Sequence, residues 1–495
     1  MNAAEHLLGE EALSRHGTRT ALLCESREVS YAELAQQVGR ASNVLRATGV
    51  RPGERVMLLM RDTPEFAAAW LGTVHAGAVA IGLNSKLAES DYRHMVEDSA
   101  VRLVIADEAL LPALGALGAE LEHARRLLRL PAWLSRLADA APAAQPHAAR
   151  DEDPAFWLFS SGTTGRPKAI VHTHRNVRPS GQAQREVFGL GPGDRIFTTS
   201  KLFFAYALEN GLLGPLSLGA TAILHPDWVD VESARALIER HTPAAVFSVP
   251  TFYRHLLGLA PDRLVPFRSV RHYVAAGERL PGTLLATWRT ATGREIRSLY
   301  GMSETYCAAI VGGKPLAGVE ARLSAVDERD ADAGESGVMW IRHPALSPGY
   351  ANRPDANQEQ FRDGWFCTRD LFVRDSQGGY SHQGRSDELV KVAGQWVQPG
   401  ELEEAVHGLD VVAEAACVAV PDADGFERLA LFVAAKGPDA RAAIAAAERA
   451  CAEKLPRHKR PKWVLPVEAL PRTATGKVQR FKLRELLAQR HAAEE

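Results

Sequence analysis

The segment Phe159-Ser160-Ser161-Gly162-Thr163-Thr164-Gly165-Arg166-Pro167-Lys168-Ala169-Ile170 carries the clearest chemical signal in this 495-residue chain. Apolar residues lie on both sides of it, so the pattern predicts a polar loop between two strands. Its glycines allow main-chain conformations closed to other residues, and main-chain N–H groups can therefore converge on one point. Hydroxyl groups and Lys168 add donors and a positive charge. This composition suits a phosphate or pyrophosphate group.

The spacing of this loop differs from that of a P-loop. The arrangement G-x-x-x-x-G-K-[ST] is absent, and no helix pattern follows Lys168 at once. A P-loop kinase or ATPase is therefore disfavoured. On these residues alone, a solvated Ser/Thr/Gly turn stays an alternative.

Composition indicates a globular protein of about two to four domains. An apolar content of 46% with 24% charged residues is ordinary for a soluble protein. The net charge of -2 offers no electrostatic case for binding nucleic acid or an acidic membrane surface. Glu5 and the lack of a long apolar stretch at the N-terminus argue against a signal peptide.

The cysteines and one uncharged stretch bear on the compartment. Five cysteines are widely scattered without a C-x-x-C pair, which argues against disulfides or a zinc site and predicts a cytoplasmic protein. Residues 66–83 carry no charge, but they include His75 and Gly77 and are rich in alanine. We expect a buried helix and a strand there, and no membrane span.

Strands alternate with helices through most of the chain. The capping box Ser30–Glu33 begins a helix, and apolar runs predict strands at 55–60, 78–81, 101–105, 220–224, 245–249 and 273–276. This alternation predicts an α/β fold with parallel strands covered by helices. Residues 110–150 are predicted to be a surface connection. Short β-like segments dominate after about residue 320.

The pattern changes again around Asp387. A helix from Pro399, strands at 416–420 and 431–434 and a helix over 440–454 predict a small α+β domain of about a hundred residues. We therefore expect a large domain of mixed and parallel sheets layered with helices over 1–386, and a small domain over 387–495.

Two loops after predicted strands combine residues suited to nucleotide chemistry. Gly277-Glu278 follows one strand, and Tyr300-Gly301-Met302-Ser303-Glu304 follows the next. Ligands of open α/β sheets lie beyond the carboxyl ends of strands, so we expect the loops to face one crevice. Glu304 is a hard oxygen ligand suited to Mg²⁺ beside phosphates, and Ser303 is a phosphate donor. A surface turn with a solvated glutamate is the alternative.

Two later segments carry paired charges and a reachable lysine. Asp370 and Arg385 can hold a ribose diol, or they can pair with one another. Lys477 lies in the Gly/Thr-containing stretch 471–480, where a basic solvated turn would have the same composition.

Taken together and in this order, these segments resemble the adenylate-forming superfamily of acyl-CoA synthetases, luciferases and peptide-synthetase adenylation domains. The resemblance covers nearly the whole chain. Its motifs are 160–168, Tyr300 to Glu304, Gly364-Trp365 with Asp370, 384–387 and 471–477. Five motifs in sequence order are far more specific than any one of them.

The resemblance implies two half-reactions at one site. A carboxylate attacks the α-phosphate of ATP and gives an acyl-adenylate and pyrophosphate; a thiol, usually that of coenzyme A, then displaces AMP to give a thioester. ATP, Mg²⁺ and coenzyme A are the implied cofactors. The first step needs no general base, because a carboxylate is already ionised at neutral pH.

The resemblance also implies residue roles. Lys477, Glu304, Thr164 and Lys168 would be catalytic, with Glu304 on Mg²⁺, and Asp387 would be the hinge of a mobile C-terminal domain. Gly277, Glu278 and Tyr300 would line the adenine, Asp370 and Arg385 would hold the ribose, and Gly394-Gln395-Trp396 would face the pantetheine tunnel. The remaining nucleotide-binding positions are Ser160, Ser161, Gly162, Thr163, Thr164, Gly165, Lys168, Gly301 and Ser303.

For the acid, residues 202–208 resemble the corresponding stretch of benzoate-CoA ligases. The implied pocket comprises Phe204, Ala205, Tyr206, Ala276, Gly301, Cys307 and Ala308. An aromatic wall beside small residues suits a flat ring, although an aromatic core cluster has the same composition. Three positions depart from the family pattern: Cys307 replaces a histidine of benzoate ligases, Arg369 a common glycine and Glu388 an aspartate.

The leading hypothesis is an aryl-carboxylate:CoA ligase for benzoate or a substituted benzoate. Its partner would be a small carboxylic acid, with no nucleic acid, and the chain would be a monomer or homodimer. One alternative is an adenylating enzyme for a short- or medium-chain acid, or one that loads a carrier protein. Another is a catalytically silent nucleotide-binding homologue, against which the joint presence of Glu304, Asp370, Arg385 and Lys477 argues.

Overall fold

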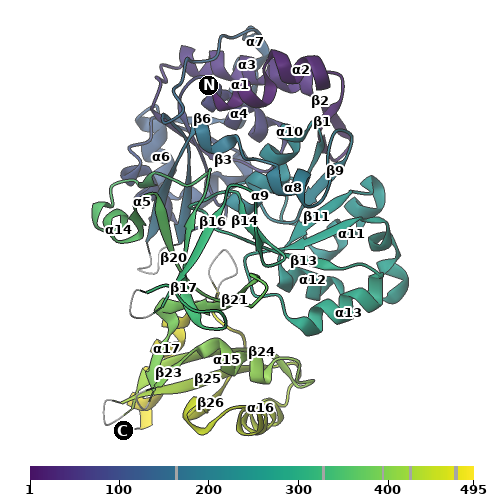
Figure 1. The fold of residues 1–495 in the computed structure, drawn as a ribbon. Coiled ribbons are helices and arrows are strands. Elements are labelled where there is room, and N and C mark those ends of the chain that lie inside the picture. The colour runs from purple at the N-terminus through teal and green to yellow at the C-terminus, as the bar shows by residue number, and fades with distance from the viewer. Residues whose placement is uncertain (162–165, 326–328, 393–394, 423–425, 473–477, 495) are drawn as a thin grey trace. The chain divides into compact units, whose positions relative to one another are not determined.

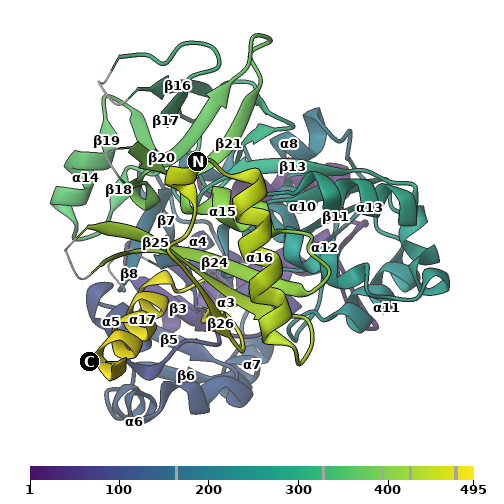
Figure 2. The ribbon, with the colours of Figure 1, turned by 90° about the horizontal axis from the view of Figure 1, so that it is seen from below.

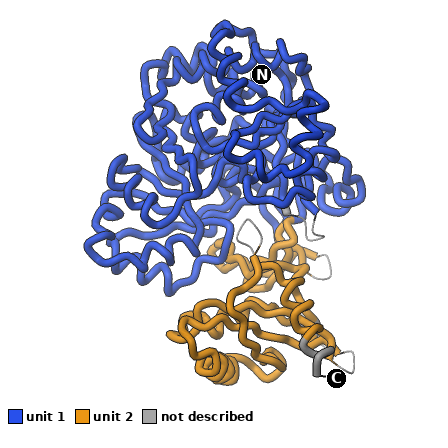
Figure 3. The backbone as a smooth tube through the Cα atoms, turned by 180° about the vertical axis from the view of Figure 1, so that it is seen from behind, with its two compact units in different colours: residues 1–322, 340–367 blue, residues 323–339, 368–495 orange. Residues whose placement is uncertain are grey.

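The computed structural model describes residues 1–161, 166–325, 329–392, 395–422, 426–472 and 478–494. The side chains of 161, 391, 395, 396 and 490–494 lie outside that description. The chain divides into two compact units (Figure 3): residues 1–322 with 340–367, and residues 323–339 with 368–495. The predicted domain boundary between residues 386 and 387 stays a prediction.

One sheet of the first unit contains the predicted phosphate loop. Within the described residues it has seven strands, in the order β18-β8-β7-β4-β3-β5-β6. Figure 1 labels two of them, β3 and β6. Their bounds are Gly349–Tyr350, Pro167–Thr173, Pro154–Ser161, Val79–Gly82, Arg55–Leu59, Leu103–Ala106 and Leu127–Arg129. The strands from β7 to β6 run parallel, whereas β8 is antiparallel to both β7 and β18.

A second sheet of the same unit carries the predicted nucleotide loops. Nine strands of the described chain form it, in the order β15-β14-β13-β12-β11-β9-β10-β1-β2. Their bounds are Lys314–Pro315, Ala308–Val311, Ile296–Gly301, His272–Ala275, Ala245–Ser248, Arg195–Thr198, Thr221–Leu224, Thr20–Cys24 and Arg27–Ser30. Strands β13 to β1 are parallel, and antiparallel strands close both edges.

Helices form three layers, one between the two sheets and one on the outer face of each sheet. The largest hydrophobic cluster takes residues from both sheets and from α1 (Ala3–Leu8), α3 (Tyr31–Ala47) and α4 (Pro64–His75), so these helices lie between the sheets. Helices α11 (Val231–His241), α12 (Pro250–Leu256) and α13 (Gly282–Thr292) cover the outer face of the nine-stranded sheet. Helices α5 (Glu89–Asp98) and α6 (Ala116–His123) cover that of the seven-stranded sheet. The shorter or peripheral helices are α2 (Glu10–His16), α7 (Leu130–Asp139), α8 (Gln182–Glu186), α9 (Ala205–Leu208), α10 (Gly214–Leu218) and α14 (Pro354–Gln360).

The local predictions for this unit hold in most places. The capping box at Ser30 is formed by reciprocal bonds with Glu33. The uncharged stretch 66–83 is a buried helix, α4, followed by strand β4. Among the helices that the structure describes, none is long and apolar enough to cross a membrane.

The prediction of a surface connection over 110–150 was wrong. The segment contains α6, β6 and α7, and the side chains of Leu117, Leu121 and Trp133 are buried. The alanine and arginine content hid a helix that places one leucine per turn against the sheet, a weak periodicity in a short window.

The second unit ends in a small α+β domain. Strands β24 (Val412–Pro421), β25 (Glu427–Ala435) and β26 (Trp463–Val467) form its sheet, with β24 antiparallel and β26 parallel to β25. Helices α15 (Pro399–Val406) and α16 (Ala440–Lys454) cover one face, and α17 (Arg480–Glu494) covers the other (Figure 2). Alternate residues of β24 and β25 supply the two hydrophobic clusters, because successive side chains of a strand point to opposite faces.

Short strands precede this domain in the chain. They are β16 (Glu320–Ser324), β17 (Ser336–Arg342), β19 (Phe361–Arg362), β20 (Trp365–Arg374), β21 (Tyr380–Arg385), β22 (Val390–Val392) and β23 (Gln395–Val397). The predicted α/β class, with layered sheets and a small α+β part, is confirmed. The mobility of that part stays a prediction.

Candidate active site

The predicted phosphate loop joins the strands β7 and β8, as the sequence predicted. The two strands form an antiparallel hairpin in which Ser160 lies opposite Lys168 and Ser161 opposite Pro167. Residues Gly162, Thr163, Thr164 and Gly165 lie outside the described residues. Beside the hairpin, a cleft of about 490 Å³ is lined by basic residues and by the start of α14: Arg166, Lys168, Asn352, Arg353, Pro354, Asp355 and Ala356.

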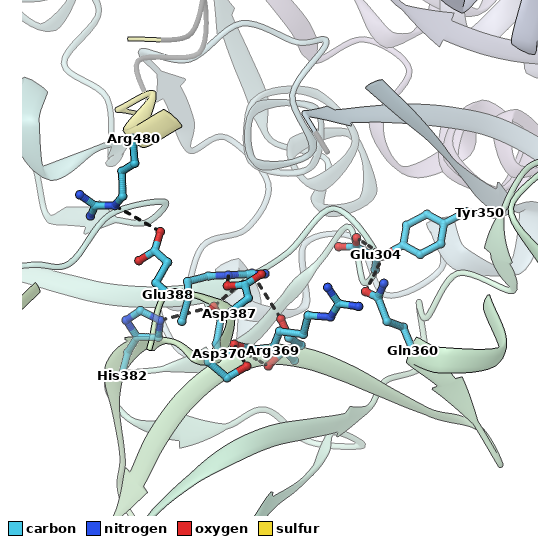
Figure 4. A network of polar contacts seen from close by, with 12 residues as sticks. Glu304, Tyr350, Gln360, Arg369, Asp370, His382, Asp387, Glu388 and Arg480 are labelled. Carbon is cyan, nitrogen blue, oxygen red and sulfur yellow. Dashed lines mark hydrogen bonds and ion pairs between the residues drawn. The ribbon is translucent and has the colours of Figure 1, made fainter. Parts of the chain in front are cut away.

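Tyr350 links two predicted site residues that are far apart in sequence. Its hydroxyl donates a hydrogen bond of 2.8 Å to Glu304 Oε1 and lies 3.1 Å from Gln360 Oε1 (Figure 4). On the other side, Lys168 Nζ lies 5.4 Å from the centroid of the Tyr350 ring. The predicted loop lysine and the predicted magnesium ligand therefore lie around one aromatic side chain.

Two main-chain contacts hold the Glu304 segment against the hairpin. Ring Nε2 of His172, on β8, lies 2.8 Å from the carbonyl oxygen of Ser303, and the amide of Ser347 donates to the carbonyl of Glu304 at 2.8 Å. Burial lowers the pKa of His172 to about 4, so the ring is neutral and Nε2 carries the proton that it donates. Because β8 belongs to the seven-stranded sheet and Glu304 follows β13 of the nine-stranded sheet, these bonds join the two sheets at the site.

The parallel strands that precede the two predicted nucleotide loops are neighbours in the nine-stranded sheet. Ser248, Ala275 and Ser298 are paired across β11, β12 and β13, so the loops that follow these strands begin at one edge. Gly277 has a φ of +83°, a left-handed conformation that glycine takes without strain. Glu278 Oε2 accepts hydrogen bonds from the amide and hydroxyl of Thr251, in the first turn of α12, at 3.0 and 2.7 Å. Tyr300, near the end of β13, is half-buried.

The predicted acyl-pocket residues gather at the same edge. The Tyr206 hydroxyl lies 3.3 Å from the carbonyl oxygen of Ser248 and 3.2 Å from that of Val274, near the ends of β11 and β12. Its ring packs in one hydrophobic cluster with Ala276 and Ala308, while Cys307 lies in another, against which Ala205 packs. Gly301 is exposed, and Phe204, Ala205 and Tyr206 are half-buried at the start of α9.

A buried ion pair that the sequence did not reveal fixes the segment before this pocket. Lys201 Nζ lies 3.0 Å from Asp62 Oδ2 and donates to the carbonyls of His225, Pro226 and Asp227 at 2.8–3.0 Å. The same carboxylate accepts from the amide of Leu202 at 3.1 Å. Burial raises the pKa of Asp62, and the charge of Lys201 opposes that rise. A single lysine before an aromatic run was the only sequence signal.

A second unforeseen group is the carboxyl group of Glu209. It is 1% exposed and begins a π-helical turn, Glu209–Leu213, directly after α9. Burial raises the pKa of Glu209 to about 7. The sequence signal was a lone glutamate in the apolar run 207–213.

In the second unit, Arg385 binds two carboxylates. Asp370 and Arg385 are register partners in the antiparallel pair β20–β21, with Nη1 of Arg385 3.4 Å from Asp370 Oδ1. Arg385 also makes a two-point contact with Asp387, at 3.0 and 2.8 Å. Burial would raise the pKa of Asp387, but the hydrogen bonds and charge of Arg385 hold that pKa below its usual value. Of the two alternatives left by the sequence, the structure shows the pairing; the ribose role stays a prediction.

Arg369, which replaces a glycine that is common in the family, has an unusual backbone conformation. Its φ is +59°, in the left-handed region that glycine takes most readily. The position before Asp370 therefore favours glycine for a backbone reason.

Some predicted residues cannot be placed as side chains. Gly394 and Lys477 lie outside the described residues, and Gln395 and Trp396 are described as the backbone of β23 alone. Asp387 lies in a short 3-10 turn, Ser386–Glu388, after β21.

The described side chains fit a magnesium ion that arrives with a nucleotide. No cluster of three or more His, Cys, Asp or Glu side chains among the described residues forms a dedicated metal cage. Glu304 offers one carboxylate held by Tyr350, beside the strand that carries Lys168. Magnesium typically takes one or two carboxylates and completes its shell with phosphate oxygens and water.

Comparison with known proteins agrees with this arrangement. The AMP-binding enzyme family model matches residues 9–351, and the model of the AMP-binding enzyme C-terminal domain matches 401–477. The chain belongs to the AMP-binding enzyme family. The predicted membership of the adenylate-forming superfamily is thereby confirmed.

Similar proteins cover almost the full length of the chain. A 3-hydroxybenzoate--CoA/4-hydroxybenzoate--CoA ligase of Thauera aromatica is 38% identical, and a 3-hydroxybenzoate--CoA ligase of Aromatoleum sp. (strain CIB) is 39% identical; each comparison covers 98% of this chain and 97% of the relative. The crystal structure of the anthranilate CoA ligase AuaEII with anthranoyl-AMP superposes with a TM-score of 0.91 at 30% identity, covering 98% of this chain and 97% of that one. A benzoate CoA ligase from Burkholderia xenovorans LB400 gives 0.88 at 31%, covering 98% and 100%.

Replacing Tyr350 by Phe tests the support of Glu304. We expect the Mg²⁺ concentration for half-maximal activity to rise about 10- to 100-fold, the usual effect of removing a hydrogen bond that orients a metal ligand. The measurement is a Mg²⁺ titration of acid-dependent AMP formation. Tyr92→Phe, which removes another buried hydroxyl hydrogen-bonded to a carbonyl, is the control and should leave the titration unchanged. An unshifted titration for Tyr350→Phe would contradict the role of this bond.

Replacing Lys201 by Met tests the buried ion pair. It should lower the free energy of unfolding by about 3–5 kcal/mol, because Asp62 would stay buried without its counter-charge. Denaturant unfolding and the melting temperature measure this loss. Arg129→Met, which breaks an exposed pair with Glu122, should cost far less. Equal losses in the two variants would show that burial does not distinguish the pairs.

Proposed function

We propose that this chain is an ATP-dependent, AMP-forming ligase that joins an aryl carboxylic acid to coenzyme A. One observation carries the proposal: within a chain of this family, Lys168 and Glu304 lie around the Tyr350 ring where the two sheets meet, and the aromatic side chain of Tyr206 lies at the strand ends of the nine-stranded sheet. The site therefore has a charged end, at Lys168 and Glu304, and an aromatic end, at Tyr206. An aryl acid carries both a carboxylate and a ring, so it can use both ends.

The charged end suits the first half-reaction. Negative charge builds on the phosphates as the acid attacks and pyrophosphate leaves, so fixed positive charge and donors aimed there lower the barrier. The backbone and hydroxyls of 160–165 and the ammonium group of Lys168 would hold the leaving pyrophosphate. Glu304 would hold Mg²⁺, which when bound neutralises phosphate charge. Lys477 is proposed to bind the reacting carboxylate and α-phosphate, by the family resemblance alone.

The other end positions the nucleoside and the acid. Gly277, Glu278 and Tyr300 would contact the adenine, where the glycine conformation keeps the loop clear of side chains. The Tyr206 hydroxyl is anchored on two strand ends, so its ring would form a fixed wall against a planar substrate. The relatives named above as hydroxybenzoate, benzoate and anthranilate ligases support an aryl acid.

Further parts of the proposal concern the thiol, the second half-reaction and the assembly. Coenzyme A is the proposed thiol because the relatives are named CoA ligases. Gly394, Gln395 and Trp396 are proposed to line its path, and Asp387 to be the hinge between the two half-reactions. A cytoplasmic location is proposed from the scattered cysteines, and the proposed assembly is a monomer or homodimer.

A screen of carboxylic acids tests the proposed function. With ATP, Mg²⁺ and coenzyme A, benzoate and monosubstituted benzoates should yield acyl-CoA and AMP. Their kcat/KM should exceed that of acetate by at least about 100-fold, because acetate lacks the ring carbons that are buried at about 0.8 kcal/mol each. It should also exceed that of hexanoate, whose flexible chain loses more conformational freedom against a planar wall. Preference for an aliphatic acid, or transfer to a phosphopantetheinylated carrier without free CoA turnover, would favour one of the alternatives.

A further inference from the structure

The buried carboxyl group of Glu209 is only partly hydrogen-bonded. Its Oε1 accepts a hydrogen bond of 3.1 Å from the amide of Gly181. Within the described residues, its Oε2 is buried and has no hydrogen-bond partner. A buried polar oxygen without a donor costs free energy, so such a group needs an explanation.

Glu209 lies one helical turn beyond the proposed acyl pocket. Its amide donates to the carbonyls of Ala205 and Tyr206, the residues four and three positions earlier. Residues at these spacings share one face of a helix. Glu209 is 1% exposed, whereas Tyr206 is half-buried, so Glu209 is the more deeply buried of the two residues.

Burial raises the pKa of Glu209, and hydrogen bonds from the Gly181 amide and the Asn210 side chain oppose that rise; Oε2 nevertheless has no hydrogen-bond partner among the described residues. The hydroxyls of Ser180 and Tyr306 lie 2.6 Å apart, so one of them donates a hydrogen bond to the other. The charge of Glu209 is felt at Tyr206, Tyr306 and Cys307, whose pKa values are raised chiefly by burial and further by Glu209. Gln184, whose Nε2 donates to Asn210, presents a second buried acceptor, Oε1, without a partner in the described chain. Oε2 of Glu209 and Oε1 of Gln184 are therefore two buried acceptors without a hydrogen-bond partner in the described chain.

We propose that Glu209 selects aryl acids that carry a hydroxyl or amino group on the ring, by accepting a hydrogen bond from that group at Oε2. The inference rests on the proposed function and narrows its substrate class. A phenol or an aniline supplies the missing donor at the far end of a planar acid. Unsubstituted benzoate does not, and sites built to bind a polar group strongly reject the analogue that lacks it.

Two variants test this selection with different chemistry. Glu209→Leu removes the acceptor, so the ratio of kcat/KM for the best hydroxybenzoate isomer to that for benzoate should fall about 10- to 100-fold. Glu209→Gln keeps an oxygen for the Gly181 amide but can present a donor to the ring. It should therefore depress aminobenzoate more than hydroxybenzoate, since a hydroxyl also accepts hydrogen bonds.

The assay compares benzoate with the three hydroxybenzoates and the three aminobenzoates, in wild type and in both variants. Glu186→Gln, which removes an exposed carboxylate from α8, is the matched control and should leave all ratios unchanged. If the melting temperature falls but every ratio stays as in wild type, Glu209 serves only the internal contacts to Gly181 and Asn210, and the inference is overturned. Should wild type turn over no aryl acid, the proposed function fails with it, whereas benzoate turnover with unaltered ratios rejects the selection alone.

Discussion

The hydrogen bond from Tyr350 to Glu304, with the neighbouring bond from His172 to Ser303, holds the candidate site together. Each crosses from the seven-stranded sheet to the segment after β13 of the nine-stranded sheet. The phosphate loop belongs to one sheet and the nucleotide loops to the other, so neither sheet alone contains the site. The neutral state of His172 matters, because only one ring nitrogen then carries a proton to donate.

Two buried charged groups, the Lys201–Asp62 pair and Glu209, differ in how fully they are hydrogen-bonded. The pair Lys201–Asp62 is closed on itself, since the ammonium also meets three carbonyls and the carboxylate also meets an amide. Such a group rigidifies the backbone before α9. Glu209 differs, because one of its oxygens has a donor and the other has none in the described chain. We therefore assign a structural role to the Lys201–Asp62 pair and propose a substrate-binding role for Glu209.

Much of the fold could be predicted because its signals are local. The capping box at Ser30, the loop between β7 and β8 and the strand ends before Gly277 and Ser303 each depend on a few adjacent residues. Tyr350 and His172 could not be predicted, because their partners lie 46 and 131 residues away and the side-chain types are unremarkable. The helices within 110–150 were not predicted, because their many alanines weaken the periodic spacing of large apolar side chains. The conformation of Arg369 explains the glycine preference that the sequence comparison noted without a cause.

Acid-dependent exchange of labelled pyrophosphate into ATP, measured without coenzyme A, tests the central claim most directly. If the junction of the two sheets activates an aryl acid on ATP, a hydroxybenzoate or benzoate should drive the exchange. Addition of coenzyme A should then yield AMP and the aryl thioester in equal amounts. Release of ADP and phosphate, or exchange that does not depend on the acid, would contradict the account.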